Sequence, residues 1–178
     1  MSRPVLFALL SIACTVLSAQ AAPLAVPESV AAGAEPARND AAAEVEVRAV
    51  IERFRTAIIA GDGDALRALF LPEPRAWVSV LDDAGLARVR ARDPLASRVR
   101  PDTYERFARS VQENAGREEE VFSGIGIRTD GLVATVVFDF DYRIDGKVGN
   151  RGLEAWQLVR TDAGWKIVSL VYSSRSRP

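Results

Sequence analysis

The residues best placed for chemistry lie on one face of an expected strand near the C-terminus. Glu154, Trp156 and Leu158 are spaced two apart, so an extended chain turns all three side chains to the same side. A carboxyl group held beside an indole in an apolar pocket can have a raised pKa and act as a general base. The alternative, which we favour from the sequence, is that Glu154 pairs with Arg143 or Arg151 on a solvated or subunit-facing sheet.

Two aspartates and the tyrosines extend the choice of acid–base groups. Asp139 and Asp141 lie two apart beside Arg143, and paired carboxylates on one strand face can share a proton. The opposite face of that strand is apolar, which favours a solvated or subunit-contacting stripe instead. Tyr172 can donate a hydrogen bond to a reacting group. Tyr142 lies on the face opposite to both aspartates, which argues against a site that combines it with them.

The composition excludes several catalytic classes. The chain has no histidine, and its only cysteine is Cys14. Without histidine there is no Ser-His-Asp or Cys-His relay and no histidine metal site. No P-loop or dinucleotide fingerprint is visible, so we expect neither a metal nor a cofactor. The formal net charge of −1 also argues against nucleic acid as a partner.

Residues 1–21 have the layout of a secretory signal peptide. Arg3 gives a short positive region, an apolar run follows, and Ala19-Gln20-Ala21 forms a small-x-small cleavage site. The apolar run is too short for a confident membrane span, so we expect a periplasmic or secreted protein with no stable membrane insertion after cleavage. A retained anchor is the alternative. A lipoprotein attached through Cys14 is disfavoured, because apolar residues continue past this cysteine.

Residues 22–42 are rich in alanine and proline and predict a tether to a domain at 43–175. Apolar residues then recur at helical spacing in three places, which predicts three helices. They are expected from about 43 to the stop at Gly61, at 65–70, and at about 102–114. The Arg-rich segment 86–100 is expected to be a loop with at most one helical turn. It can cover a cavity or bind an anion, but its interspersed acids favour a solvated surface.

Alternating apolar and polar residues predict strands at 77–81, 119–128, 132–143, 152–159 and 165–172. Short turns rich in Asp and Gly join the last four of them. Helices followed by hairpin-linked strands predict an α+β fold with an antiparallel sheet.

This order of elements resembles the nuclear transport factor 2-like superfamily. The residues that carry the resemblance are FRTAIIAGDGDALRALF at 54–70 and GLEAWQLVRTDAGWKIVSLVYSS at 152–174. The resemblance implies a cone-like half barrel, in which three N-terminal helices pack in a curved antiparallel sheet of four to six strands around an apolar cavity. It also implies a homodimer formed through the sheet. The segment 86–100 has no clear counterpart in the superfamily.

The superfamily includes isomerases, cyclases and dehydratases beside many proteins without catalysis, so the resemblance does not transfer a reaction. We expect an exported protein that binds a small apolar ligand or mediates assembly without catalysis. The expected ligand contacts are Phe54, Trp77, Glu154, Trp156 and Leu158. The alternative is a cyclase-, isomerase- or dehydratase-type enzyme, with Glu154, Asp139 and Tyr172 as candidate catalytic residues. A pocket of a few hundred Å³ that receives one of these carboxylates would favour the enzyme.

Overall fold

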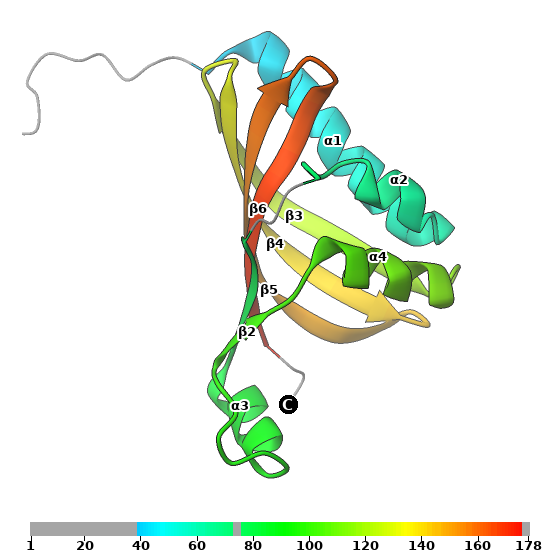
Figure 1. Cartoon of the computed structure of the whole chain (residues 1–178), viewed down its shortest axis with the longest axis vertical. Helices are drawn as coiled ribbons and strands as arrows, with labels where there is room; N and C mark the ends of the chain where they lie inside the picture. The colour runs from blue at the N-terminus through cyan, green and yellow to red at the C-terminus, as the bar shows by residue number, and fades with distance from the viewer. Residues whose placement is uncertain (1–38, 73–75, 176–178) are drawn as a thin grey trace, which may run out of the picture. The chain divides into compact units, whose positions relative to one another are not determined.

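The computed structural model describes residues 39–72 and 76–175 of the chain (Figure 1). The expected signal peptide, and the expected tether up to residue 38, lie outside the described residues. No helix in the described part of the chain is long and apolar enough to cross a membrane.

Six strands form one curved, unclosed sheet in the order β2-β1-β6-β5-β4-β3. The strands are β1 (Ala76–Leu81), β2 (Val99–Pro101), β3 (Glu118–Thr129), β4 (Val133–Ile144), β5 (Lys147–Thr161) and β6 (Gly164–Ser174). All neighbours are antiparallel except β1 and β6, which run parallel with Trp77 opposite Leu170. The expected wholly antiparallel sheet is therefore wrong for this pair. These two strands are far apart in the chain, so no hairpin forces them to run antiparallel.

The described residues contain four helices, α1 (Ala41–Ala60), α2 (Gly63–Arg67), α3 (Asp83–Arg90) and α4 (Tyr104–Glu113). Each helix begins at an Asp or Thr whose side chain accepts a hydrogen bond from the backbone N–H three residues later. Figure 1 shows α1, α2 and α4 on the same side of the curved sheet, and α3 apart from them beyond β2. Helices α1, α2 and α4 overlap the segments at 43–61, 65–70 and 102–114 in which the sequence predicts helices.

Helix α3 lies inside the Arg-rich segment that was expected to be a loop. Asp82 caps it by accepting a hydrogen bond of 2.7 Å from the N–H of Gly85. Leu86 is its only large buried side chain, so the helix has no apolar stripe for periodicity to detect. Arg88 and Arg90 lie in its last turn, where positive charge stabilises a helix.

The core lies between α1 and the inner face of the sheet. Along β4 the buried side chains alternate with exposed ones, because successive side chains of a strand point to opposite faces. The buried members are Ala134, Val136, Phe138 and Phe140. They pack in one cluster with the apolar stripe of α1, which consists of Val47, Val50, Ile51, Phe54 and Ile58. The inner face of the sheet is therefore the one that carries Phe138, Glu154 and Trp156.

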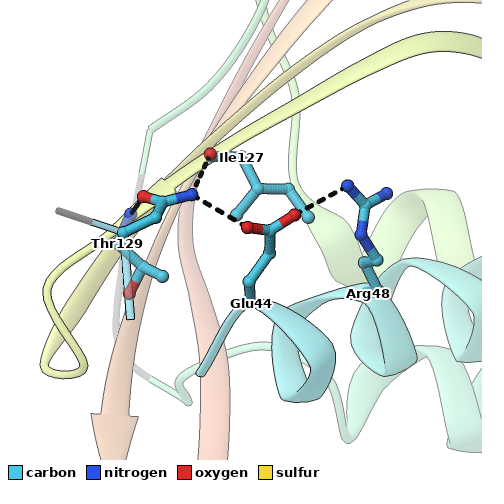
Figure 2. A network of polar contacts seen from close by, with 5 residues as sticks. Glu44, Arg48, Ile127 and Thr129 are labelled. Atoms are coloured by element: carbon cyan, nitrogen blue, oxygen red, sulfur yellow. Dashed lines mark hydrogen bonds and ion pairs between the residues drawn. The ribbon is translucent and has the colours of Figure 1, made fainter. Parts of the chain in front are cut away.

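The start of α1 is tied to β3 by polar contacts (Figure 2). The side chain of Asn39 donates a hydrogen bond of 2.8 Å to the carbonyl of Ile127 and accepts one of 2.8 Å from the N–H of Thr129. It also donates to Glu44 at 3.0 Å, and Glu44 accepts a further bond from Arg48 at 2.8 Å. The ordered domain thus includes Asn39, earlier than the start expected at residue 43.

Candidate functional site

A cavity of about 270 Å³ lies between the inner face of the sheet and helices α1 and α4. Phe54 of α1 and Phe107 of α4 line it from the helical side, and Trp77 of β1 lines it from the sheet. Ile144 at the end of β4 also lines the cavity and is 40% exposed, so the cavity meets solvent at this end. Two layers of rigid structure therefore hold the side chains around it.

Three buried glutamates line the cavity. Glu118 and Glu120 are each 5% exposed, and Glu154 is 4% exposed. The first two share the inner face of β3, and Glu154 comes from β5, with β4 between the two strands. Across the ladders, Tyr142 lies opposite Glu120, and Phe138 lies opposite Glu154. Burying an ionised carboxylate is costly unless it is paired, so burial favours the protonated forms of Glu120 and Glu154.

Glu154 has one strong hydrogen-bond donor. The indole Nε1 of Trp156 donates a hydrogen bond to its Oε1. Burial raises the pKa of Glu154 to about 8, although the bond from Trp156 acts in the opposite direction. Tyr172 lies directly opposite Glu154 in the β5–β6 ladder and also lines the cavity. At neutral pH this carboxyl group can therefore release or take up a proton.

Glu120 is coupled to Glu154. Burial raises the pKa of Glu120 well above its ordinary value, and repulsion from the Glu154 carboxylate raises it further. The two groups therefore titrate as a pair. The cavity thus holds two coupled carboxyl groups that can take up and release a proton.

Glu118 and Tyr142 lie on the same side of the cavity. Burial raises the pKa of Tyr142, and its hydrogen bond with Glu118 raises it further. The Oε2 atom of Glu118 is buried and has no hydrogen-bond partner among the residues that the structure describes. An unpartnered buried acceptor of this kind calls for an explanation.

Comparison with known proteins bears on the fold. No family model matches the sequence, and no curated protein matches it. Solved structures do match. A protein of unknown function from Shewanella baltica OS155, described as NTF2-like (nuclear transport factor 2-like), superposes with a TM-score of 0.55 at 14% identity, covering 79% of this chain and 98% of that one. This chain has the NTF2-like fold. The resemblance seen in the sequence is thereby confirmed at the level of the fold.

Two further structures extend this comparison. A proposed dehydratase of the NTF2-like family from Streptomyces avermitilis has a TM-score of 0.52 at 18% identity, covering 73% of this chain and 94% of that one. A protein of unknown function with a cystatin-like fold from Nostoc punctiforme has a TM-score of 0.53 at 12% identity, covering 77% and 94%. At such identities the comparison shows the fold alone and transfers no reaction to this chain.

The structure brings four of the expected site residues together. Phe54, Trp77, Glu154 and Tyr172 all line the cavity of this NTF2-like fold. Trp156 and Leu158 are fully buried and do not line it, although Trp156 reaches it through its hydrogen bond to Glu154. Sequence reasoning assigned no role to Glu118 or Glu120 and set Tyr142 aside.

The structure places Asp139 elsewhere. Its side chain is exposed on the outer face of β4, because it alternates with the buried Phe138 and Phe140. Asp141 shares that outer face and forms ion pairs with Arg143 at 3.8 Å and with Arg151 at 3.4 Å. The two arginines considered as partners for Glu154 are thus engaged on the opposite face of the sheet. Asp139 and Asp141 thus lie on the outer face with Arg143, as in the solvated or subunit-contacting stripe considered for them.

Among the described residues, no three side chains of His, Cys, Asp or Glu are arranged to hold a metal ion. Glu118, Glu120 and Glu154 instead surround the cavity from two strands, and aromatic rings occupy the wall between them.

Proposed function

We propose that the protein is an enzyme that moves a proton within a small, largely apolar molecule bound in the cavity. The reaction class is isomerisation, cyclisation or dehydration by acid–base chemistry. The observation that carries the proposal is the pair of buried carboxyl groups, Glu120 and Glu154, on the wall of one cavity, where the indole N–H of Trp156 donates a hydrogen bond to Glu154. Of the two functions expected from the sequence, this is the enzymatic alternative.

The two glutamates take different roles in this proposal. Glu154 is the base, because the N–H of Trp156 stabilises its ionised form. Glu120 is the acid, since burial and the neighbouring Glu154 charge both keep its proton bound. Tyr172, opposite Glu154, is placed to donate a hydrogen bond to an oxygen of the substrate on which charge develops.

The size of the cavity bounds the substrate. A volume of about 270 Å³ holds roughly nine water-sized groups, since one water occupies about 30 Å³. The rings of Phe54, Trp77 and Phe107 provide an apolar wall that excludes water from the reacting groups. The substrate is therefore a small molecule with about ten non-hydrogen atoms.

A generic proton-transfer probe tests the proposal without knowledge of the substrate. In 5-nitrobenzisoxazole a base removes the ring C–H proton, the N–O bond breaks, and a coloured nitrile-phenolate forms. We expect the protein to accelerate this reaction, with a rate that rises as pH increases through about 8, because Glu154 must be ionised. Glu154→Gln should reduce the acceleration by about a hundredfold or more.

The matched control for this test is Asp139→Asn, which removes a carboxylate from the outer face and should leave the rate unchanged. Equal rates for the wild type and Glu154→Gln would exclude Glu154 as the base, provided that circular dichroism shows both proteins to be folded. In that case the non-catalytic binding function expected from the sequence would stand.

We also propose the homodimer that the sequence resemblance implies. Val137, Ala155, Val171 and Val78 lie side by side on the outer face across four strands. Val137 and Val171 are 36% and 42% exposed, and an apolar stripe of this kind supports a subunit contact. Light scattering with size-exclusion chromatography tests it, and a monomeric mass at high protein concentration would contradict it.

A further inference from the structure

All the described side chains of Asp, Glu, Lys or Arg type that line the cavity are acidic. Among the described residues that line it, Asp102, Glu118, Glu120 and Glu154 carry carboxyl groups, and none is lysine or arginine. The arginines of the adjoining strands, Arg143 and Arg151, point to the outer face and pair with acids there. Thus none of the described residues that line the cavity brings a positive charge to the three glutamates buried there. Arg117, which precedes Glu118 in the chain and attracts it, is paired with Asp145 at 2.7 Å.

The wall between the carboxyl groups is aromatic. Rings of Phe54, Trp77, Phe107, Phe140, Tyr142 and Tyr172 line the cavity. Several of these rings touch one another, with centroids 5.2 Å apart for Trp77 and Phe107 and 5.7 Å apart for Phe140 and Tyr172. Faces of aromatic rings attract cations, and rings grouped around a cavity are the usual receptor for substituted ammonium groups.

One buried oxygen atom in the cavity wall lacks a hydrogen-bond partner among the described residues. This atom is the Oε2 of Glu118, on a side chain that is 5% exposed. A carboxylate oxygen in this condition costs free energy that a bound positive group or donor would recover.

We propose that the cavity binds a small organic cation, an amine or quaternary ammonium compound, with its charged group among Glu118, Glu120 and Glu154 and against the aromatic rings. The inference rests on the proposed function, because it names the substrate class of the same cavity. It adds that the charge of the bound substrate helps to ionise the catalytic base, Glu154. A positive charge beside Glu154 favours the ionised carboxylate, so a bound cation converts this residue into a base near neutral pH.

A pair of probes that differ in charge and not in shape tests the inference. Choline and its neutral carbon isostere, 3,3-dimethyl-1-butanol, are titrated into the wild-type protein by calorimetry. We expect choline to bind at least about tenfold more tightly than the alcohol, because only choline carries the positive charge. The affinity for choline should increase from about pH 6 to pH 8 as Glu154 ionises, whereas that for the alcohol should not.

Substitution of Glu118 tests whether this residue contacts the charged group of the bound cation. Glu118→Gln should weaken choline binding at least about tenfold, since a buried charge pair is lost. Asp139→Asn, on the outer face, is the matched control and should leave binding unchanged. Equal affinity of the wild type for choline and for the alcohol overturns the inference, and this comparison needs no variant.

The two proposals fail separately. If choline does not bind while 5-nitrobenzisoxazole is still turned over through Glu154, the cation inference is wrong and the acid–base function stands. If choline binds as described but no turnover of the neutral probe depends on Glu154, the cavity is a cation-binding site and the acid–base function is wrong.

Discussion

The indole Nε1 of Trp156 donates a hydrogen bond to the carboxylate of Glu154, two residues earlier on the same face of β5. Cα atoms two apart on a strand lie about 7 Å from each other, so only long side chains can meet in this way. Trp156 is fully buried, and water cannot replace its N–H. The bond therefore fixes the orientation of the carboxylate and limits the rise of its pKa.

Trp156→Phe should raise the apparent pKa of Glu154 above about 8, because the hydrogen bond from the indole favours the ionised form. The loss of one hydrogen bond to a charged group corresponds to about one pH unit. The measurement is a carbon-13 NMR titration of the glutamate carboxyl groups. Trp165→Phe is the control, since its Nε1 bonds to Glu46 at 2.8 Å, away from the cavity. An unchanged titration of Glu154 in Trp156→Phe would show that the bond has no such effect.

The free energy of unfolding should fall as pH rises from about 5 to about 8. In this range folded Glu154 keeps its proton, whereas the unfolded side chain has already lost it near its ordinary pKa of 4.5. The folded state then binds more protons, so each such group lowers the unfolding free energy by about 1.4 kcal/mol per pH unit, and Glu154 ceases to contribute above pH 8. Glu120 contributes in the same direction.

Urea denaturation of the wild type and Glu154→Gln over this pH range measures the effect. The variant should show a smaller slope, and Asp139→Asn should follow the wild type. A wild-type stability that does not depend on pH between 5 and 8 would mean that Glu154 titrates normally.

Gly152→Ala should destabilise the protein by about 2 kcal/mol or more, because a Cβ there would overlap the carbonyl oxygen of Ser173 on the neighbouring strand. Thermal and urea denaturation measure the loss. Gly149→Ala is the matched control on the same strand, since a Cβ at that position meets no atom within 4 Å. Equal stabilities of the two variants would argue against a close approach of β5 and β6 at Gly152.

Asn39→Ala should cost about 1–3 kcal/mol of unfolding free energy, because it leaves the carbonyl of Ile127 and the N–H of Thr129 without their side-chain partner. Arg48→Ala removes only an exposed ion pair with Glu44 and should cost at most about 0.5 kcal/mol. A loss for Asn39→Ala as small as that of Arg48→Ala would show that α1 does not depend on this anchor.

Five of the strands and the helices α1, α2 and α4 could be predicted from the sequence because they bury apolar side chains in a regular pattern. Strand β2 was not predicted, since all three of its residues are exposed. The same alternation that identified β4 turns Asp139 outward, since Phe138 and Phe140 are buried on the other side. Helix α3 escaped prediction because it buries little besides Leu86 and is stabilised by its cap. The spacing of apolar residues in a sequence indicates which side chains are buried. An element that buries few side chains therefore shows little of this pattern.

The burial of Glu118 and Glu120 on β3 could not be predicted from the sequence. Three consecutive acids, Glu118 to Glu120, are typical of a solvated segment, and Glu119 indeed faces outward and pairs with Arg143 at 3.3 Å. The two flanking glutamates are buried only because α1 and α4 cover the inner face. Phe122 continues their face of the strand, and this alternation was the one local signal available.

The three tryptophans of this chain occupy three different environments, and this makes the protein its own fluorescent reporter. Trp77 lines the cavity and its emission responds to what enters. Trp156 senses the ionisation of Glu154 through its bonded N–H. Trp165, bonded to Glu46 of α1, follows the docking of that helix on the sheet. With two of the three replaced by phenylalanine, the remaining indole reads occupancy, protonation or helix docking alone, without an added dye.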